Sequence, residues 1–277
     1  MAEITKEKVV ELREKTGAGL IDCKRALVES DGDIEEAVGI LRKKGVATAA
    51  KKAGREAGDG VIACKVASDG CSGVIVEVNC ETDFVAKNED FLAFADEIAG
   101  TLLSDPNADL EDRRTEQVAK IGENIRISRS ESFSPEISGR VESYVHTGGK
   151  VGVLLALSTE SEAGANHEET RTLAKNLCMQ VAATAPVCVN RGDVPEEIVT
   201  KEREIATAQA EGKPPQAVEK IIAGKLEKFY ATSCLDEQSF VKNPDQTIKG
   251  LLVEIGKVVG EALSIAKFTR LQIGETG

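Results

Sequence analysis

The chain has 277 residues, of which 41% are hydrophobic and 30% charged, a composition typical of soluble globular proteins with a sizeable core. Its net charge of −12 argues against a broad nucleic-acid-binding surface, because such surfaces need Lys and Arg to neutralise phosphates. No apolar run reaches the roughly 18 residues that a membrane span requires, so we expect direct contact with neither nucleic acid nor a membrane.

Seven cysteines are scattered along the chain without a Cys-x-x-Cys pair. An odd number of unclustered cysteines is typical of a reducing compartment. Residues 1–6 carry no apolar run behind a basic segment and do not resemble a secretion signal. We therefore expect a cytoplasmic protein with buried thiols, although Cys64 and Cys71 could face each other across a hairpin.

Residues 1–45 predict three short helices. Thr5 is placed to cap the first helix, and Asp33, followed three residues later by Glu36, is placed to cap the third. The unit is near the lower size limit for independent folding and resembles a ubiquitin-associated (UBA-like) domain. Residues 46–58 are rich in Ala, Lys and Arg and predict a basic helical linker whose charges face solvent.

The rest of the chain predicts an α+β core built from a duplicated β-hairpin and helix. A hairpin over residues 61–78 precedes a helix over 91–103, a further helix to about 121 and a strand from 125. The pattern recurs 79 positions later, where Gly139 matches Gly60, Gly152 matches Gly73 and Leu173 matches Phe94. We therefore predict two core subdomains, over residues 59–136 and 137–277.

The second subdomain is predicted to contain an insertion. Two helical patterns flank Gly212-Lys213-Pro214-Pro215, which indicates an antiparallel helical hairpin over residues 195–232. Thr247 is placed to cap a last helix, and residues 265–273 alternate as a final strand.

The sequence contains no recognisable site for bond chemistry. It has no phosphate-binding glycine loop, only two histidines, and no cysteine spacing that suits zinc, so we expect neither cofactor nor metal. Two enzymatic alternatives remain open: a nucleophile pair of Cys80 with His146, and an acid pair among Glu77, Glu81 and Asp83. A binding protein without its own chemistry is favoured.

Residues 79–87 connect an apolar strand to a helix, a position where scaffolds present functional groups. They place Asp83 beside Phe84 in a loop, in a chain with only 3% aromatic residues. In one interpretation, Thr82 or Asp83 caps the next helix and Phe84 staples its first turn. In the other, Asp83 and Phe84 form a binding site. A staple that belonged to the scaffold would recur in the second copy, where Ala163 stands instead.

Two stretches together resemble the signatures of the bacterial elongation factor Ts family. The first is residues 16–27, Thr-Gly-Ala-Gly-Leu-Ile-Asp-Cys-Lys-Arg-Ala-Leu, and the second is residues 77–86, Glu-Val-Asn-Cys-Glu-Thr-Asp-Phe-Val-Ala. Residues 121–125 and 143–146 also resemble family segments. The resemblance covers nearly the whole chain. It implies a guanine-nucleotide exchange factor that binds GDP-bound elongation factor Tu, displaces Mg²⁺ and promotes GDP release, so that GTP can bind.

The resemblance also implies roles for single residues. The segment that displaces Mg²⁺ from the partner matches Thr82, Asp83, Phe84 and Val85. Positions that bind the partner match Leu20, Ile21 and Lys24 in the first domain, with Gly122, Glu123, Asn124 and His146 adding interface. Longer family members continue beyond the last strand into a further helix that contacts the partner. This sequence stops at Gly277, so that contact is expected to be absent.

Overall fold

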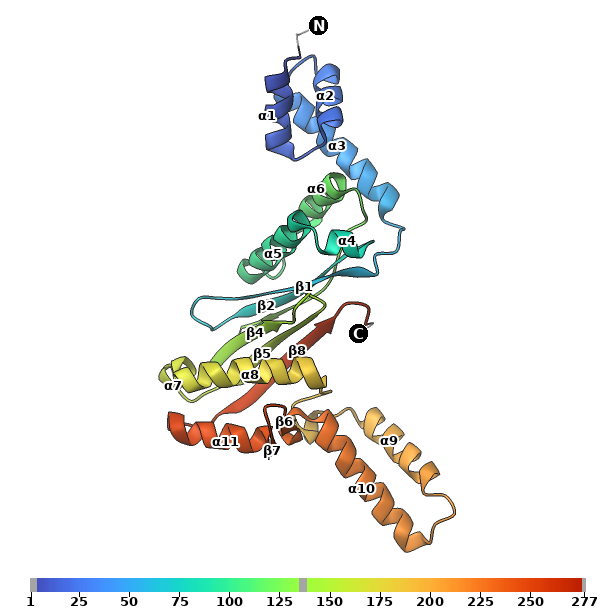
Figure 1. The fold of residues 1–277 in the computed structure, drawn as a ribbon, viewed down its shortest axis with the longest axis vertical. Helices are drawn as coiled ribbons and strands as arrows, with labels where there is room; N and C mark the ends of the chain where they lie inside the picture. The colour runs from blue at the N-terminus through green and yellow to red at the C-terminus, as the bar shows by residue number, and fades with distance from the viewer. Residues whose placement is uncertain (1–3, 135–138, 276–277) are drawn as a thin grey trace.

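The computed structural model describes residues 4–134 and 139–275 (Figure 1). The boundary predicted between residues 136 and 137, and the two ends of the chain, lie outside the described residues. The described part is elongated: three N-terminal helices lie at one end, two small sheets in the middle, and a helical hairpin at the other end (Figure 1). The mixed helices and antiparallel sheets agree with the α+β class.

The N-terminal unit consists of α1 (Lys6–Thr16), α2 (Leu20–Glu29) and α3 (Ile34–Lys52). Both predicted caps are confirmed, because Thr5 Oγ1 accepts from the backbone N–H of Lys8 at 3.4 Å and Asp33 Oδ1 from that of Glu36 at 2.9 Å. The unit has its own small core, in which these residues are fully or almost fully buried: Leu12, Cys23, Ala26, Leu27 and Ala37.

Helix α3 runs through residue 45 without interruption. The Ala-rich stretch contains no residue that breaks a helix before Gly54, so the third helix and the first part of the predicted linker form one element that ends at Lys52. Through this helix the N-terminal unit is continuous with the segment that enters the first sheet. The domain boundaries themselves remain a prediction.

The first subdomain contains an antiparallel sheet in the order β1 (Asp59–Val66), β2 (Gly73–Cys80), β3 (Arg126–Phe133). Helix α5 (Glu89–Ser104) packs on one face of it, and α6 (Glu111–Ile121) packs against α5 and α3 (Figure 1). Buried side chains from strands and helices, such as Val76, Phe91 and Ile98, form one core. Each large apolar side chain buried there contributes about 1.5–3 kcal/mol to folding.

The second subdomain repeats this arrangement with β4 (Gly139–Val145), β5 (Val151–Ser158) and β8 (Ser264–Gln272), covered by α8 (Glu168–Thr184) and α11 (Ile248–Val259). The duplication extends to a local irregularity. The register of β2 against β3 shifts between Glu77 and Val78, and that of β5 against β8 shifts between Ala156 and Leu157, again 79 positions apart. The predicted duplication of hairpin and helix is present.

The two sheets pack face to face about an approximate two-fold axis. The N–H of Ile62 donates to the carbonyl of Gly149 at 2.7 Å, and the equivalent N–H of Val141 donates to the carbonyl of Gly70, also at 2.7 Å. Glycine is required at Gly73 in β2, because a Cβ atom there would lie 2.7 Å from Val141 Cγ1. The equivalent Gly152 faces the side chain of Ile62 with even less space.

The predicted insertion over residues 195–232 corresponds to α9 (Glu196–Gln209) and α10 (Pro215–Ser233), and the short helices η1 (Arg191–Asp193) and η2 (Leu235–Glu237) flank it. Helices α9 and α10 form an antiparallel pair that projects from the core (Figure 1). The short strands β6 (Ser239–Phe240) and β7 (Asn243–Thr247) lead back to α11, which Thr247 caps as predicted. No helix among the described residues is long and apolar enough to cross a bilayer.

Candidate functional site

The segment after β2 is a single helical turn, α4 (Asp83–Ala86), rather than the open loop that the sequence predicts. Thr82 caps this turn, since its Oγ1 accepts from the N–H of Val85 at 3.4 Å. Asn88 then caps α5 with Oδ1, which accepts from Asp90 N–H at 2.8 Å. The capping role predicted for Thr82 is confirmed, but it applies to α4 and not to the long helix.

The side chain of Phe84 is 82% exposed. The interpretation in which Phe84 staples a helix is therefore wrong, because a staple packs against a neighbouring side chain and loses its exposure. Val85, the next residue, is half-buried against the core of the first subdomain. The turn is thus anchored on its inner side by Val85 and presents an isolated aromatic ring on its outer side.

Asp83 lies beside Phe84 on the exposed side of the turn. Its Oδ2 accepts from Lys87 Nζ at 2.7 Å, and this contact raises the pKa of the lysine. Both side chains are at least half exposed, so the ion pair contributes little to stability and is easily exchanged for another partner. The carboxylate is available for interaction outside the chain.

Glu123 holds the entry to α4 with both oxygens of its carboxylate. Oε2 accepts from the backbone N–H groups of Glu81 at 3.0 Å and Thr82 at 3.1 Å, and Oε1 accepts from Thr82 Oγ1 at 2.7 Å. We call this arrangement of Glu123 with Glu81 and Thr82 the carboxylate clamp. Hydrogen bonds to an ionised group are the strong ones in proteins, so the clamp fixes the direction in which α4 leaves the strand.

Asn124 adds a second layer of support. Its backbone N–H donates to Glu81 Oε1 at 2.6 Å, and its Nδ2 donates to the carbonyl of Arg55 at 2.8 Å. The first of these bonds is the main reason why the pKa of Glu81 is lowered. These contacts connect the turn to the segment that follows α3, and through it to the N-terminal unit.

The structure therefore places Gly122, Glu123 and Asn124 beneath α4. Asn124 is only 1% exposed, so its side chain offers no surface to a second protein. Gly122 is exposed and ends α6 with a positive φ of 86°, a conformation that favours glycine. Their predicted contribution to partner binding remains untested, and the observed contribution of Glu123 and Asn124 is to hold the turn.

The outer face of α2 carries the other group of predicted binding residues. Ile21 is 70% exposed, and Leu20 and Lys24 are exposed beside it. The structure adds Val28 to this face, also exposed and one helical turn beyond Lys24. Sequence reasoning missed Val28, although its spacing of four from Lys24 and seven from Ile21 places it on the same side of the helix.

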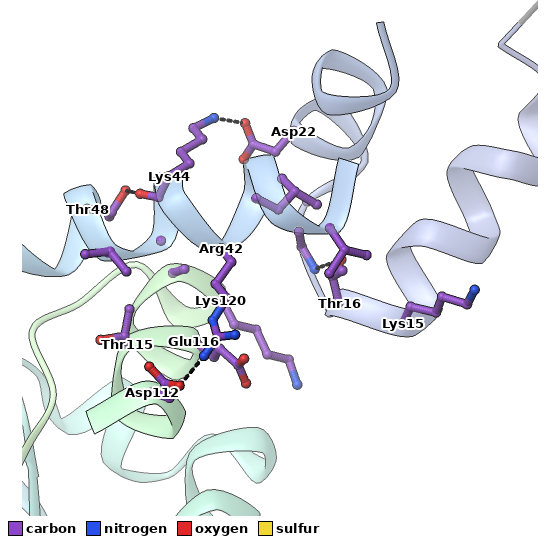
Figure 2. A pocket seen from close by; sticks show the side chains of 17 residues that line it. Lys15, Thr16, Asp22, Arg42, Lys44, Thr48, Asp112, Thr115, Glu116 and Lys120 are labelled. Atoms are coloured by element: carbon purple, nitrogen blue, oxygen red, sulfur yellow. Dashed lines mark hydrogen bonds and ion pairs between the residues drawn. The ribbon is translucent and has the colours of Figure 1, made fainter. Parts of the chain in front are cut away.

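A cavity of about 270 Å³ lies where the N-terminal unit meets α6 (Figure 2). Ion pairs of Lys44 with Asp22 and of Arg42 with Asp112 lie at its edges. Its floor is close-packed, because Gly45 of α3 lies against Ala119 of α6. This cavity marks the joint between the two exposed faces, one on α2 and one on α4, and all its charged pairs are satisfied within the chain.

The enzymatic alternatives find no support in the geometry. Cys80 is fully buried, burial raises the pKa of its thiol to about 12, and Sγ donates to the carbonyl of Thr82 at 3.2 Å. His146 is exposed at the end of β4, where its Nδ1 lies 2.9 Å from the hydroxyl of Tyr144. Within the described residues no hydrogen bond joins Cys80 to His146, and the buried thiol is closed to solvent.

The predicted acid pair is also not formed. Glu77 is buried and accepts from Arg129 Nε at 2.6 Å, while Glu81 bonds to Asn124 and Asp83 to Lys87. Over residues 4–134 and 139–275, no three His, Cys, Asp or Glu side chains are grouped to hold a metal ion.

Comparisons with known proteins agree on one family. The sequence model described as "Elongation factor TS" matches residues 81–275. Elongation factor Ts of Clostridium botulinum is 44% identical over 288 residues, covering 98% of this chain and 93% of that protein. The protein of the same name from Symbiobacterium thermophilum is 44% identical over 284 residues, and that from Prosthecochloris aestuarii 41% over 293, each covering 99% of this chain and respectively 93% and 100% of the relative.

Proposed function

Because the chain belongs to the elongation factor Ts family, we propose that it is a translation elongation factor that exchanges guanine nucleotide on elongation factor Tu. It binds the GDP-bound partner, displaces Mg²⁺ and promotes GDP release, so that GTP can bind. One observation carries the proposal: Phe84, 82% exposed, stands on a helical turn that the carboxylate clamp holds in place.

In this proposal Phe84 is a wedge. An aromatic side chain that is exposed in the free protein and buried in a partner's pocket is a typical hot spot of binding energy. The turn is already ordered, so little conformational entropy is lost when the ring enters the pocket. Asp83 then acts on the polar network around the partner's Mg²⁺, helped by the weakness of its surface ion pair with Lys87.

No covalent bond is made or broken by this chain. Its effect is a coupling of two binding equilibria: if the exchange factor weakens GDP binding by some factor, GDP weakens binding of the exchange factor by the same factor. GTP and the partner's Mg²⁺ then displace the exchange factor in turn. A chain with this role needs no cofactor and acts in the cytoplasm, where translation takes place.

The α2 face is proposed as the second contact. Leu20, Ile21 and Lys24 dock the UBA-like N-terminal unit on the partner's nucleotide-binding domain, and His146, on the second subdomain, meets the partner's other domains. The support is exposure: large apolar side chains in a row on a helix are the kind of surface that a partner covers. Helix α3 and the contacts of Asn124 with Arg55 hold this face at a fixed distance from α4.

The test is release of a fluorescent GDP analogue from purified elongation factor Tu after mixing with excess unlabelled GDP. The wild-type chain is expected to accelerate release, and the double variant Asp83→Ala/Phe84→Ala to lose most of that acceleration. Glu162→Ala is the matched control, because Glu162 occupies the position of Asp83 in the second copy. Unchanged release with the wild-type chain contradicts exchange. If exchange survives the double substitution, the assignment to α4 is wrong.

A further inference from the structure

Two cysteines touch at the base of the helical hairpin α9–α10. The Sγ atoms of Cys188 and Cys234 are 3.8 Å apart, and both thiols are free. Cys188 follows α8 in the segment that leads into the hairpin, and Cys234 ends α10. The hairpin thus begins just after one thiol and ends just before the other, and 46 positions of sequence separate them.

The backbone around the two thiols is already paired. Leu235 N–H donates to the carbonyl of Cys188 at 2.9 Å, and Val187 N–H donates to that of Ser233 at 2.8 Å, so the two segments form a short parallel bridge. Paired strands lie about 4.7–4.9 Å apart. This spacing lies within the range of roughly 4.4–6.8 Å between Cα atoms that a disulfide spans. The sulfur atoms, 3.8 Å apart, must approach by about 1.8 Å to reach the length of a disulfide bond.

We infer that Cys188 and Cys234 are a redox-active dithiol that a low-molecular-weight disulfide converts into an intramolecular disulfide, which locks the base of the helical hairpin. The thiolate of Cys188, which at 8% exposure is the more accessible of the two, attacks one sulfur of the reagent and releases the first small thiol. The thiolate of Cys234 then attacks Cys188 Sγ and releases the second. One reagent S–S bond breaks, one protein S–S bond forms, and the two thiol protons leave with the two small thiols.

The surroundings make this reaction slow. Burial raises the pKa of Cys188 and raises that of Cys234 to about 12, and the carboxylates of Asp193, Asp236 and Glu237 act in the same direction on the pair. Only the thiolate attacks a disulfide. The pair therefore reacts slowly and responds to sustained rather than brief oxidation.

The disulfide would restrict how the base of the helical hairpin can open. In the reduced chain the base is held by the small apolar cluster around Cys188, Val194 and Cys234, and by Arg191, which bonds to Glu227 and Glu237 on either side of Cys234. These contacts break together when the hairpin opens locally. A covalent bond between its two ends prevents that opening and fixes the direction in which α9 and α10 project from the core.

The test uses the full chain with Cys71→Ser, which removes the exposed thiol that would otherwise link two molecules. The chain is incubated for hours with oxidised glutathione, alkylated and mapped by peptide mass spectrometry. A single disulfide joining Cys188 to Cys234 is expected, and amide hydrogen exchange across residues 187–189 and 233–236 should slow at least about tenfold. Cys188→Ser and Cys234→Ser should each abolish both effects, whereas Cys178→Ser, at a buried thiol elsewhere, should leave both intact.

Three outcomes overturn the inference. In the first, both thiols are still free after the incubation and are fully alkylated. In the second, a disulfide forms but joins another pair of cysteines. Alternatively the bond forms as expected, but hydrogen exchange at the base of the hairpin is unchanged, in which case the pair is oxidised without locking anything.

Discussion

The turns α4 and α7 (Glu162–Asn166) occupy the same place in the two copies of the core, and they are held in the same way. Ser161 caps α7 as Thr82 caps α4. Glu261 accepts from the backbone N–H groups of Glu160 at 2.9 Å and Ser161 at 3.0 Å, and from the hydroxyl of Ser161, so the carboxylate clamp of Glu123 is repeated bond for bond.

What differs is the surface of the two turns. The position of Phe84 in α4 is occupied by Ala163 in α7, and that of Val85 by Gly164. The clamp and the cap are thus properties of the scaffold, because they persist where nothing protrudes. The ring of Phe84 is an addition to that scaffold. At 82% exposure the ring gains little from packing within the chain, which agrees with the partner contact proposed for it.

Removing the ring of Phe84 should have the largest effect on nucleotide exchange and almost none on the stability of the fold. Phe84→Ala is expected to lower the second-order rate constant of partner-dependent GDP release at least about thirtyfold, the equivalent of a hot spot of about 2 kcal/mol. Because the ring is exposed, the midpoint of thermal unfolding should move by less than about 2 °C. Stopped-flow release and calorimetry measure the two quantities. A drop in exchange that is matched by loss of folded protein would remove the argument for a wedge.

The role of the metal can be separated from the role of the wedge. If Asp83 acts through the partner's Mg²⁺, chelating that ion beforehand should remove most of the difference between wild type and Asp83→Ala. In Mg²⁺ buffer we expect a difference of about tenfold, a typical size for a polar contact at an interface, and in excess EDTA less than about twofold. Glu162→Ala should match wild type in both buffers. A tenfold difference that persists in EDTA would mean that Asp83 serves in binding alone.

The carboxylate clamp of Glu123 and its equivalent at Glu261 allow a direct comparison between the two copies of the core. Glu123→Ala and Glu261→Ala each remove the same three hydrogen bonds, so both should lower the unfolding midpoint in denaturant by similar amounts. Only Glu123→Ala should impair exchange. We expect it to raise the concentration for half-maximal acceleration about tenfold while the saturating rate stays within about threefold, because a disordered turn loses affinity but still carries its wedge once bound. Glu123→Gln keeps the acceptor for the backbone N–H groups and should restore most of the affinity.

The smallest effect, on stability alone, is expected at Glu81, where the two copies differ only in the hydrogen bonds of one carboxylate. Glu81 accepts from the N–H of Asn124 and from the side chain of Arg55. Its equivalent in the second copy, Glu160, accepts within the described residues only from the N–H of Ala262, at 3.4 Å. The pKa of Glu81 is lowered in the folded chain, so its contribution to stability is present above the ordinary pKa of about 4.3 and is lost as the pH falls through the folded value. Urea unfolding from pH 6 to pH 3 should show a slightly shallower loss of stability for Glu81→Gln than for wild type. An identical profile would contradict this contribution.

Features with a local cause could be predicted from the sequence. Caps at Thr5, Asp33 and Thr247 depend on a few neighbouring residues, and the duplication is visible because equivalent glycines and apolar residues keep a spacing of 79 positions. The family signatures, over residues 16–27 and 77–86, cover the segments that contain α2 and α4. The helical turn at α4 was missed because four residues are too few to show a helical period.

Features that depend on distant residues could not be predicted. Glu123 reaches Thr82 across 41 positions, and Cys188 meets Cys234 across 46, and neither pairing leaves a pattern in the sequence. The same limit explains why Asn124 was expected at a partner surface: its burial depends on Arg55, which lies 69 positions before it. Such contacts are fixed by the packing of whole subdomains.

The approximate two-fold axis between the sheets has a consequence for stoichiometry. A two-fold rotation sends its equivalent corners to opposite sides, and α4 and α7 lie at opposite ends of the paired sheets (Figure 1). Phe84 stands on one corner and Ala163 on the other, so the duplicated core presents one aromatic turn and not two. We therefore expect one chain to act on one nucleotide site at a time.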